Sequence, residues 1–232
     1  MLECRDLATF YDVSQILFGV SLSLAKGRSA CIIGRNGVGK TTCLRTIMGL
    51  TPPAAGTVTF EGKPLNRLPP FKIARLGLGY VPEERRIFPD LTVEENLLIA
   101  ERRNPNGIAW SLDKSFEVFP ALQEFRERQG GFLSGGQQQM LTIARTLMGC
   151  PSLLLLDEPT EGLSPLMVRT LEQAIIRLKQ EGLTMLLAAQ DMHFAHNVAD
   201  DVYVMNRGAI VYSGTVEQAK ADEAQVMAHL AV

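Results

Sequence analysis

The chain alternates between short apolar runs and longer stretches in which apolar residues recur every three or four positions. Residues 29–34 (SACIIG), 152–157 (SLLLLD) and 184–190 (TMLLAAQ) are almost continuously apolar, which predicts buried strands. The helical period of residues 41–50 and 165–180 predicts helices. Buried strands separated by helices are typical of a parallel sheet, so the pattern predicts an α/β core.

Antiparallel strands are predicted near both ends of the chain. Residues 2–9 and 20–25 alternate between apolar and polar positions, as two paired strands do. Two hairpins are also expected, one within residues 56–65 that turns at Glu61-Gly62 and one within residues 202–214 around Asn206-Arg207-Gly208.

Residues 88–147 carry a mostly helical pattern that interrupts the alternation. Thr92 followed by Glu95 matches a capping box before a helix over residues 96–101. The chain is therefore predicted to be one domain over residues 1–232, an α/β core with an antiparallel β subdomain and an inserted helical subdomain over roughly 88–147.

Composition narrows the class of protein. The 232 residues are 46% hydrophobic and 21% charged, as in ordinary soluble domains. A net charge of −2 gives no field that would attract nucleic acid, so no nucleic-acid partner is expected. We expect neither a membrane span nor a signal peptide, because no apolar stretch is long enough and the first ten residues lack a basic start. The scattered cysteines are expected to be reduced, buried thiols of a cytosolic protein: Cys4, Cys31, Cys43 and Cys150.

A glycine-rich stretch, GRNGVGKT, joins the predicted strand 29–34 to the predicted helix 41–50. Its spacing matches a P-loop, in which backbone N–H groups surround a phosphate, Lys40 adds a positive charge and Thr41 offers a hydroxyl to Mg²⁺. The sequence therefore predicts an ATP site formed by Gly34, Arg35, Asn36, Gly37, Val38, Gly39, Lys40, Thr41 and Thr42.

Two acidic residues follow the predicted strand 152–157 and complete the chemistry that a P-loop requires. Asp157 ends the strand, where a carboxylate is expected to bind Mg²⁺ beside Thr41. Glu158 comes next, at the mouth of the strand, and is predicted to act as the general base for an attacking water. These residues together predict a nucleotide-hydrolysing enzyme with a P-loop NTPase core.

A second glycine-rich stretch, RQGGFLSGGQQQM at residues 128–140, leads into a helical run and resembles a second anion site. Its core, LSGGQ, is similar to the signature motif of ATP-binding cassette (ABC) proteins. That resemblance implies a dimer in which the signature of one subunit, here Ser134, Gly135, Gly136 and Gln137, covers the ATP held by the P-loop of the other. It also implies that Tyr11 stacks on adenine.

Finer features are similar to the smaller ATPase subunit of branched-chain amino acid importers: VPEERRIFPDLTVEENL, LSGGQQQM and LLLLDEPTEGLSP. Related subunits serve amide and urea importers, and a lipid exporter ATPase is a less similar alternative. The resemblance implies ATP and Mg²⁺ as ligands, and as partners transmembrane permease subunits, a second ATPase subunit (in a heterodimer or a homodimer) and, indirectly, an extracytoplasmic solute-binding protein. It places the chain peripherally on the cytoplasmic face of the plasma membrane.

Three positions depart from the general cassette pattern. Glu83 stands where a glutamine is usual and is expected near Mg²⁺, which would lower its pKa. Gln190 replaces a histidine; it can donate a hydrogen bond to the γ-phosphate but cannot become positively charged. Ser164 replaces an aspartate, which puts communication between the two ATP sites through that loop in doubt.

Other interpretations stay open at this point. The segment Glu83-Glu84-Arg85-Arg86 is as compatible with a permease-facing surface as with a solvated loop. His193 and His196 share a helical face, but no third metal ligand is suggested, so a solvated or partner-facing helix is favoured. A non-transport cassette is disfavoured by the single compact cassette and the low net charge, and a subunit without hydrolysis is disfavoured by Lys40 and Glu158.

Overall fold

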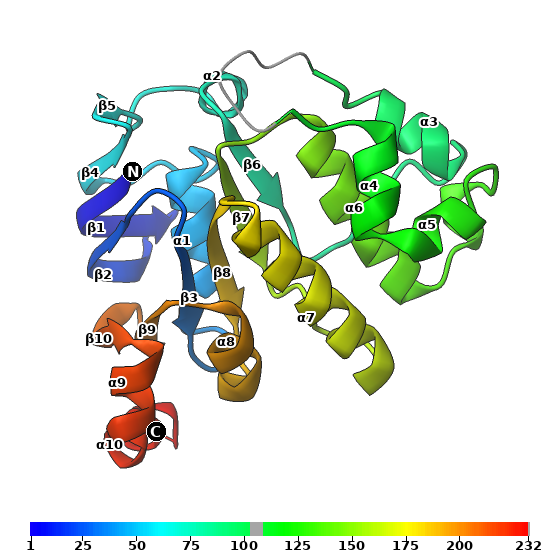
Figure 1. Ribbon diagram of the computed structural model, residues 1–232. Coiled ribbons are helices and arrows are strands. Elements are labelled where there is room, and N and C mark those ends of the chain that lie inside the picture. Colours follow the sequence, from blue (N-terminus) through cyan, green and yellow to red (C-terminus); the bar gives the residue numbers. More distant parts are fainter. Residues whose placement is uncertain (103–108, 232) are drawn as a thin grey trace.

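A six-stranded sheet forms the centre of the molecule, for which the computed structural model describes residues 1–102 and 109–231 (Figure 1). The strand order is β10-β9-β3-β8-β7-β6, parallel from β9 to β6, with β10 antiparallel at one edge. The strands are β3 (Ser29–Ile33), β6 (Leu78–Val81), β7 (Leu153–Asp157), β8 (Thr184–Ala189), β9 (Asp201–Asn206) and β10 (Ala209–Thr215). The predicted α/β core is confirmed, and β6 is a strand that the sequence did not predict.

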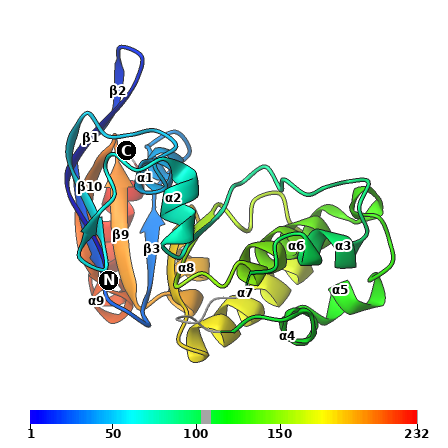
Figure 2. The same cartoon turned by 90° about the horizontal axis from the view of Figure 1, so that it is seen from above.

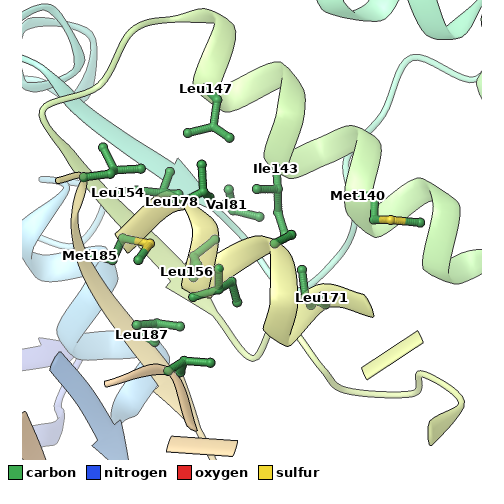
Figure 3. Packing of buried hydrophobic residues seen from close by; sticks show 14 of the residues in the cluster. Val81, Met140, Ile143, Leu147, Leu154, Leu156, Leu171, Leu178, Met185 and Leu187 are labelled. Carbon is green, nitrogen blue, oxygen red and sulfur yellow. The ribbon is translucent and has the colours of Figure 1, made fainter. Parts of the chain in front are cut away.

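The central strands are buried on both faces because the sheet separates two hydrophobic cores. Leu153 and Leu155 of β7 pack in one core, with the antiparallel sheet and α1 (Lys40–Ile47). Leu154 and Leu156 pack in the other, with α6 (Gly135–Met148) and α7 (Pro165–Gln180) (Figure 3). All four cysteines lie in the described part of the chain and are buried, and burial raises the pKa of Cys43 to about 12.

A second sheet is antiparallel and has the order β2-β1-β4-β5. Its strands are β1 (Leu2–Tyr11), β2 (Ser14–Leu24), β4 (Ala55–Phe60) and β5 (Lys63–Pro64). Strand β2 begins earlier than predicted, because Tyr11 pairs with Ser14 across a tight turn. The hairpin turn at Glu61-Gly62 is confirmed: both residues have positive φ, as a two-residue turn between antiparallel strands requires. The β9–β10 hairpin at Arg207-Gly208 has the same geometry.

Helices occupy the described residues between β6 and β7. They are α3 (Val93–Leu98), α4 (Leu112–Val118), α5 (Pro120–Glu124), a 3₁₀ turn at Gly130–Phe132, and α6. In Figure 2 they gather on one side of the molecule, away from the antiparallel sheet. The predicted helix over 96–101 was misplaced: Thr92 is itself the N-cap and its capping box with Glu95 starts α3 at Val93. Residues 103–108 of the predicted 88–147 subdomain lie outside the described residues.

Four more helices complete the described structure: α2 (Pro70–Arg75), α8 (Met192–Val198), α9 (Val216–Ala221) and α10 (Glu223–Ala231). The helix predicted over 41–50 is α1, which ends at Ile47 before the positive φ of Gly49. None of the helices in the described ranges has the combination of length and apolar character that crossing a bilayer demands.

Candidate functional site

The predicted site residues meet at one edge of the central sheet. Gly34 follows β3, Gln190 follows β8, Asp157 ends β7, and Glu83 lies two residues beyond β6. Because these four strands are neighbours and parallel, their carboxyl ends share an edge, which is where open α/β sheets bind ligands. A cavity of about 340 Å³ opens there, lined by Ile16, Asn36, Gly37, Gly39, Lys40, Thr41, Thr42, Glu83, Glu158 and Glu161.

The P-loop is folded around the ammonium group of Lys40. Gly39 caps α1 with φ 112°, a conformation that favours glycine, so the loop turns directly into the helix. Lys40 Nζ donates to the carbonyl oxygens of Gly34 (2.7 Å) and Arg35 (2.9 Å). The backbone of Val38 is fixed by a hydrogen bond from Gly208 N–H. Gly34, Arg35 and Val38 therefore support the loop without lining the cavity.

Lys40 and Glu158 form a buried ion pair. Nζ lies 2.8 Å from Glu158 Oε1, and the two side chains are only 4% and 6% exposed. Glu158 has φ 44° and its N–H donates to the carbonyl of Ala188, which turns its carboxylate back toward the P-loop. Burial raises the pKa of Glu158, although the hydrogen bond from Lys40 acts in the opposite direction. The carboxylate predicted as general base is thus held by the cation predicted to bind phosphate.

Asp157 and Thr41 form a pair of oxygen groups beside this ion pair. Thr41 Oγ1 donates to Asp157 Oδ1 at 2.9 Å, and Asp157 is completely buried. Burial raises the pKa of Asp157, while the hydrogen bonds it accepts act to lower it. Carboxylate and hydroxyl oxygens are ligands that Mg²⁺ prefers. A buried carboxylate with a raised pKa also gains from a nearby cation, so these residues fit a divalent metal.

Glu83, which was expected near Mg²⁺, lines the cavity. The pKa of Glu83 is raised, first by burial and then by the neighbouring carboxylates of Glu161 and Asp157. These causes act without a metal, so the lowering expected beside Mg²⁺ stays a prediction. Gln190 is exposed and does not line the cavity, and its Nε2 donates a hydrogen bond to Asn36 Oδ1 of the P-loop.

Tyr11, predicted to stack on adenine, does not line the cavity. It ends β1 with 42% of its surface exposed, and its hydroxyl accepts a long hydrogen bond from Thr51. Ile16 of β2 lines the cavity instead. The role of Tyr11 stays a prediction.

The predicted signature begins a helix but does not join the cavity. Ser134 is the N-cap of α6, and in its capping box the Ser134 N–H donates to Gln137 Oε1 while the Gln137 N–H donates to Ser134 Oγ. A Cβ on Gly135 would lie 2.5 Å from Arg85 Nη1, and one on Gly136 would lie 2.6 Å from Met167 Cε, so both glycines are closely packed. None of these four signature residues lines the cavity, so they do not contribute to the ATP site of their own chain in this structure.

Three contacting residues were missed by the sequence reasoning. Tyr80 donates from its hydroxyl to Asp157 Oδ2 at 2.9 Å. Arg85 donates to the carbonyl of Glu161, and Glu161 lines the cavity. A signal existed only for Glu161, as an acidic residue three positions after Glu158; Tyr80 lies on the strand that was not predicted.

Comparison with known proteins identifies this arrangement. Residues 17–161 match the family model for ABC transporters. The chain belongs to the ABC transporter family. The ATP-binding domains of this family are ATPases that work with transmembrane subunits as dimers, so this ABC ATPase subunit binds and hydrolyses ATP.

Curated relatives match the ABC subunit over nearly its whole length. It is 41% identical to the high-affinity branched-chain amino acid transport ATP-binding protein BraG of Pseudomonas aeruginosa, over 93% of each chain. It is 35% identical to the probable branched-chain amino acid transport ATP-binding protein LivF of Archaeoglobus fulgidus, over 94% of this chain and 93% of that one. It is 32% identical to the lipopolysaccharide export system ATP-binding protein LptB of Haemophilus influenzae, over 96% and 94%.

Solved cassette structures share its fold. A crystal structure of an ABC transporter cassette in its ADP conformation aligns with a TM-score of 0.83 at 27% identity, over 98% of both chains. A dimeric bacterial ABC transporter cassette aligns with a TM-score of 0.79 at 26% identity, over 93% of this chain and 99% of that one.

Proposed function

We propose that this chain is the ATP-hydrolysing subunit of an importer of branched-chain amino acids, bound peripherally at the cytoplasmic face of the membrane. The observation that carries the proposal is the 41% identity to BraG over 93% of both chains. The similarity to LivF supports the same class of transporter. The 32% identity to LptB makes a lipid exporter ATPase the second candidate.

In this proposal the P-loop binds the phosphates of ATP and Lys40 provides the positive charge. The phosphates would compete with Glu158 for Lys40 Nζ, because both are anionic and the ion pair lies in the cavity lining. ATP binding therefore releases the Glu158 carboxylate, which then accepts a proton from the attacking water. Coupling release of the base to occupation of the site would keep hydrolysis dependent on bound nucleotide.

Thr41, Asp157 and Glu83 are the groups that would hold Mg²⁺. When bound, the metal would neutralise negative charge on the phosphates. Burial raises the pKa values of Asp157 and Glu83, so keeping the two carboxylates ionised without a nearby cation is unfavourable. Gln190 would exchange its hydrogen bond with Asn36 for one with the γ-phosphate.

The signature residues 134–137 would complete the ATP site of a second ATPase subunit, whose own signature would complete this one. Support comes from the cavity lining, to which the signature of the same chain does not contribute. Permease subunits would convert closing and opening of the dimer into transport, with a solute-binding protein delivering the substrate outside the membrane.

Transport assays on the cells of origin test the cargo. Uptake of labelled leucine, short amides and urea is measured after Lys40→Ala replaces the native residue, in cells that lack other leucine importers, and lipopolysaccharide at the cell surface is measured in the same cells. Lys63→Ala, an exposed lysine on β5, is the matched control. Loss of leucine uptake alone is expected. Loss of amide or urea uptake, or of lipopolysaccharide at the cell surface, would instead assign one of those cargoes, and unchanged leucine uptake would refute the proposal.

A further inference from the structure

Tyr80 lies on β6, where its ring packs against a hydrophobic core and its hydroxyl contacts a carboxylate. It pairs with Leu155 of β7, and its ring packs on the same core as that leucine. Asp157 lies two residues beyond Leu155 and therefore on the same face of the sheet. The Tyr80 hydroxyl reaches past the edge of the core to Asp157 Oδ2 at 2.9 Å.

The Asp157 carboxylate is held at both oxygens by hydroxyl groups. Thr41 Oγ1 donates to Oδ1, and Tyr80 donates to Oδ2, each at 2.9 Å. Thr41 is on the P-loop helix and lines the cavity, whereas Tyr80 does not line it. The Asp157 carboxylate is therefore held by a cavity-lining residue at Oδ1 and by Tyr80, which does not line the cavity, at Oδ2.

We propose that Tyr80 is the positioning residue that orients Asp157 for the Mg²⁺ of the ATP site. The inference rests on the metal assignment of Asp157 and Thr41 in the proposed function, and not on the cargo. By holding Oδ2, the Tyr80 hydroxyl leaves Oδ1 turned toward Thr41, which lines the cavity. Groups that orient a metal ligand in this way typically contribute 10–100-fold to metal affinity or activity.

Tyr80→Phe removes the hydroxyl and keeps the packed ring. The free Mg²⁺ concentration for half-maximal binding of a fluorescent ATP analogue is expected to rise by about 10–100-fold. Binding of the same analogue in EDTA is expected to stay unchanged, because Lys40 and the P-loop are untouched. Both are measured on the purified chain by equilibrium fluorescence, with urea unfolding midpoints to compare folding.

Tyr203→Phe is the matched control. Tyr203 also lies on a strand of the central sheet, and its hydroxyl contacts only the backbone of Ser23 among the described residues, so the same atom is removed away from the site. Tyr203→Phe is expected to leave the Mg²⁺ dependence unchanged. An unchanged Mg²⁺ dependence in Tyr80→Phe, or equal weakening with Mg²⁺ and with EDTA, would overturn the role of Tyr80. If the unsubstituted protein bound the analogue equally tightly with Mg²⁺ and with EDTA, the metal assignment would be overturned along with the role of Tyr80, whatever the transport assay shows.

Discussion

The buried ion pair between Lys40 and Glu158 leads to a quantitative prediction for Lys40→Met. Methionine keeps a long side chain at this position but removes the charge. Glu158 is only 6% exposed, so its carboxylate would be left in the interior without a cation. Removing one partner of a buried pair typically costs about 3–5 kcal/mol.

The loss is limited because the carboxyl group can take up a proton instead. From the ordinary glutamate pKa of 4.5, protonation at pH 7 costs about 3 kcal/mol, so the expected loss at pH 7 is about 3 kcal/mol. At pH 5 the same cost is below about 1 kcal/mol. The sign follows from linkage: burial raises the folded-state pKa of Glu158 and Lys40 acts to lower it, so in Lys40→Met that pKa is expected to be higher still. The loss caused by the substitution is therefore smallest below the unfolded pKa and grows as pH rises toward the folded pKa of the variant.

Urea unfolding between pH 5 and pH 8, without nucleotide, measures this loss. The expected difference at pH 7 corresponds to a fall in Tm of roughly 6–12 °C for a domain of this size. The double variant Lys40→Met/Glu158→Gln removes both charges and is expected to regain much of the stability. A loss that is the same at pH 5 and pH 7, or a double variant no more stable than Lys40→Met, would refute the reasoning.

Three other substitutions test separate parts of the description. Glu158→Gln is expected to bind MgATP but to lower kcat by about 10²–10⁴-fold, and near-normal phosphate release would remove Glu158 as the base. Gln190→Ala is expected to lower kcat by about 10²–10³-fold through loss of one donor; a rise in KM alone would place its hydrogen bond in the ground state. Gly208→Ala is expected to destabilise the fold by well over the loss caused by Gly62→Ala, which is about 1–2 kcal/mol for a side chain at positive φ. The two glycines have similar φ, but a Cβ on Gly208 would lie 1.9 Å from the Ile16 carbonyl oxygen, whereas the space around Gly62 is open. Equal losses of stability in the two variants, measured by calorimetry, would mean that the positive φ accounts for both and that the contact with Ile16 adds nothing.

Sequence patterns predicted the elements whose signals are local. The strands β3, β7 and β8 are apolar runs, and the turns at Gly62 and Gly208 carry residues suited to positive φ. Strand β6 was not predicted because it is only four residues long and includes Gly79. Its glycine is a packing requirement, since a Cβ there would lie 2.8 Å from Thr146 Cγ2 of α6. Contacts of this kind, between segments distant in sequence, leave no local pattern.

In the candidate site, too, the residues in contiguous motifs were predicted and the contacts between distant segments were mostly missed. The P-loop lysine and the acidic pair that ends β7 are contiguous motifs, so their identities were predicted. Asp157 was also expected beside Thr41, 116 residues away in the sequence, although their direct hydrogen bond was not. The hydrogen bond from Tyr80, 77 residues from Asp157, was missed altogether. The raised pKa of Glu83 was also missed, because it depends on burial and on two acidic neighbours that the fold brings close.

The four leucines of β7 have a consequence for how that strand finds its place. A shift of the strand by one position would replace each leucine with another leucine in most of both cores, so hydrophobicity alone specifies its alignment poorly. Polar contacts at its two ends resolve the ambiguity: Ser152 N–H donates to the Gly77 carbonyl, and Asp157 accepts from Thr41 and Tyr80. The same hydroxyls and carboxylate that would serve ATP hydrolysis therefore also select one alignment among near-degenerate ones.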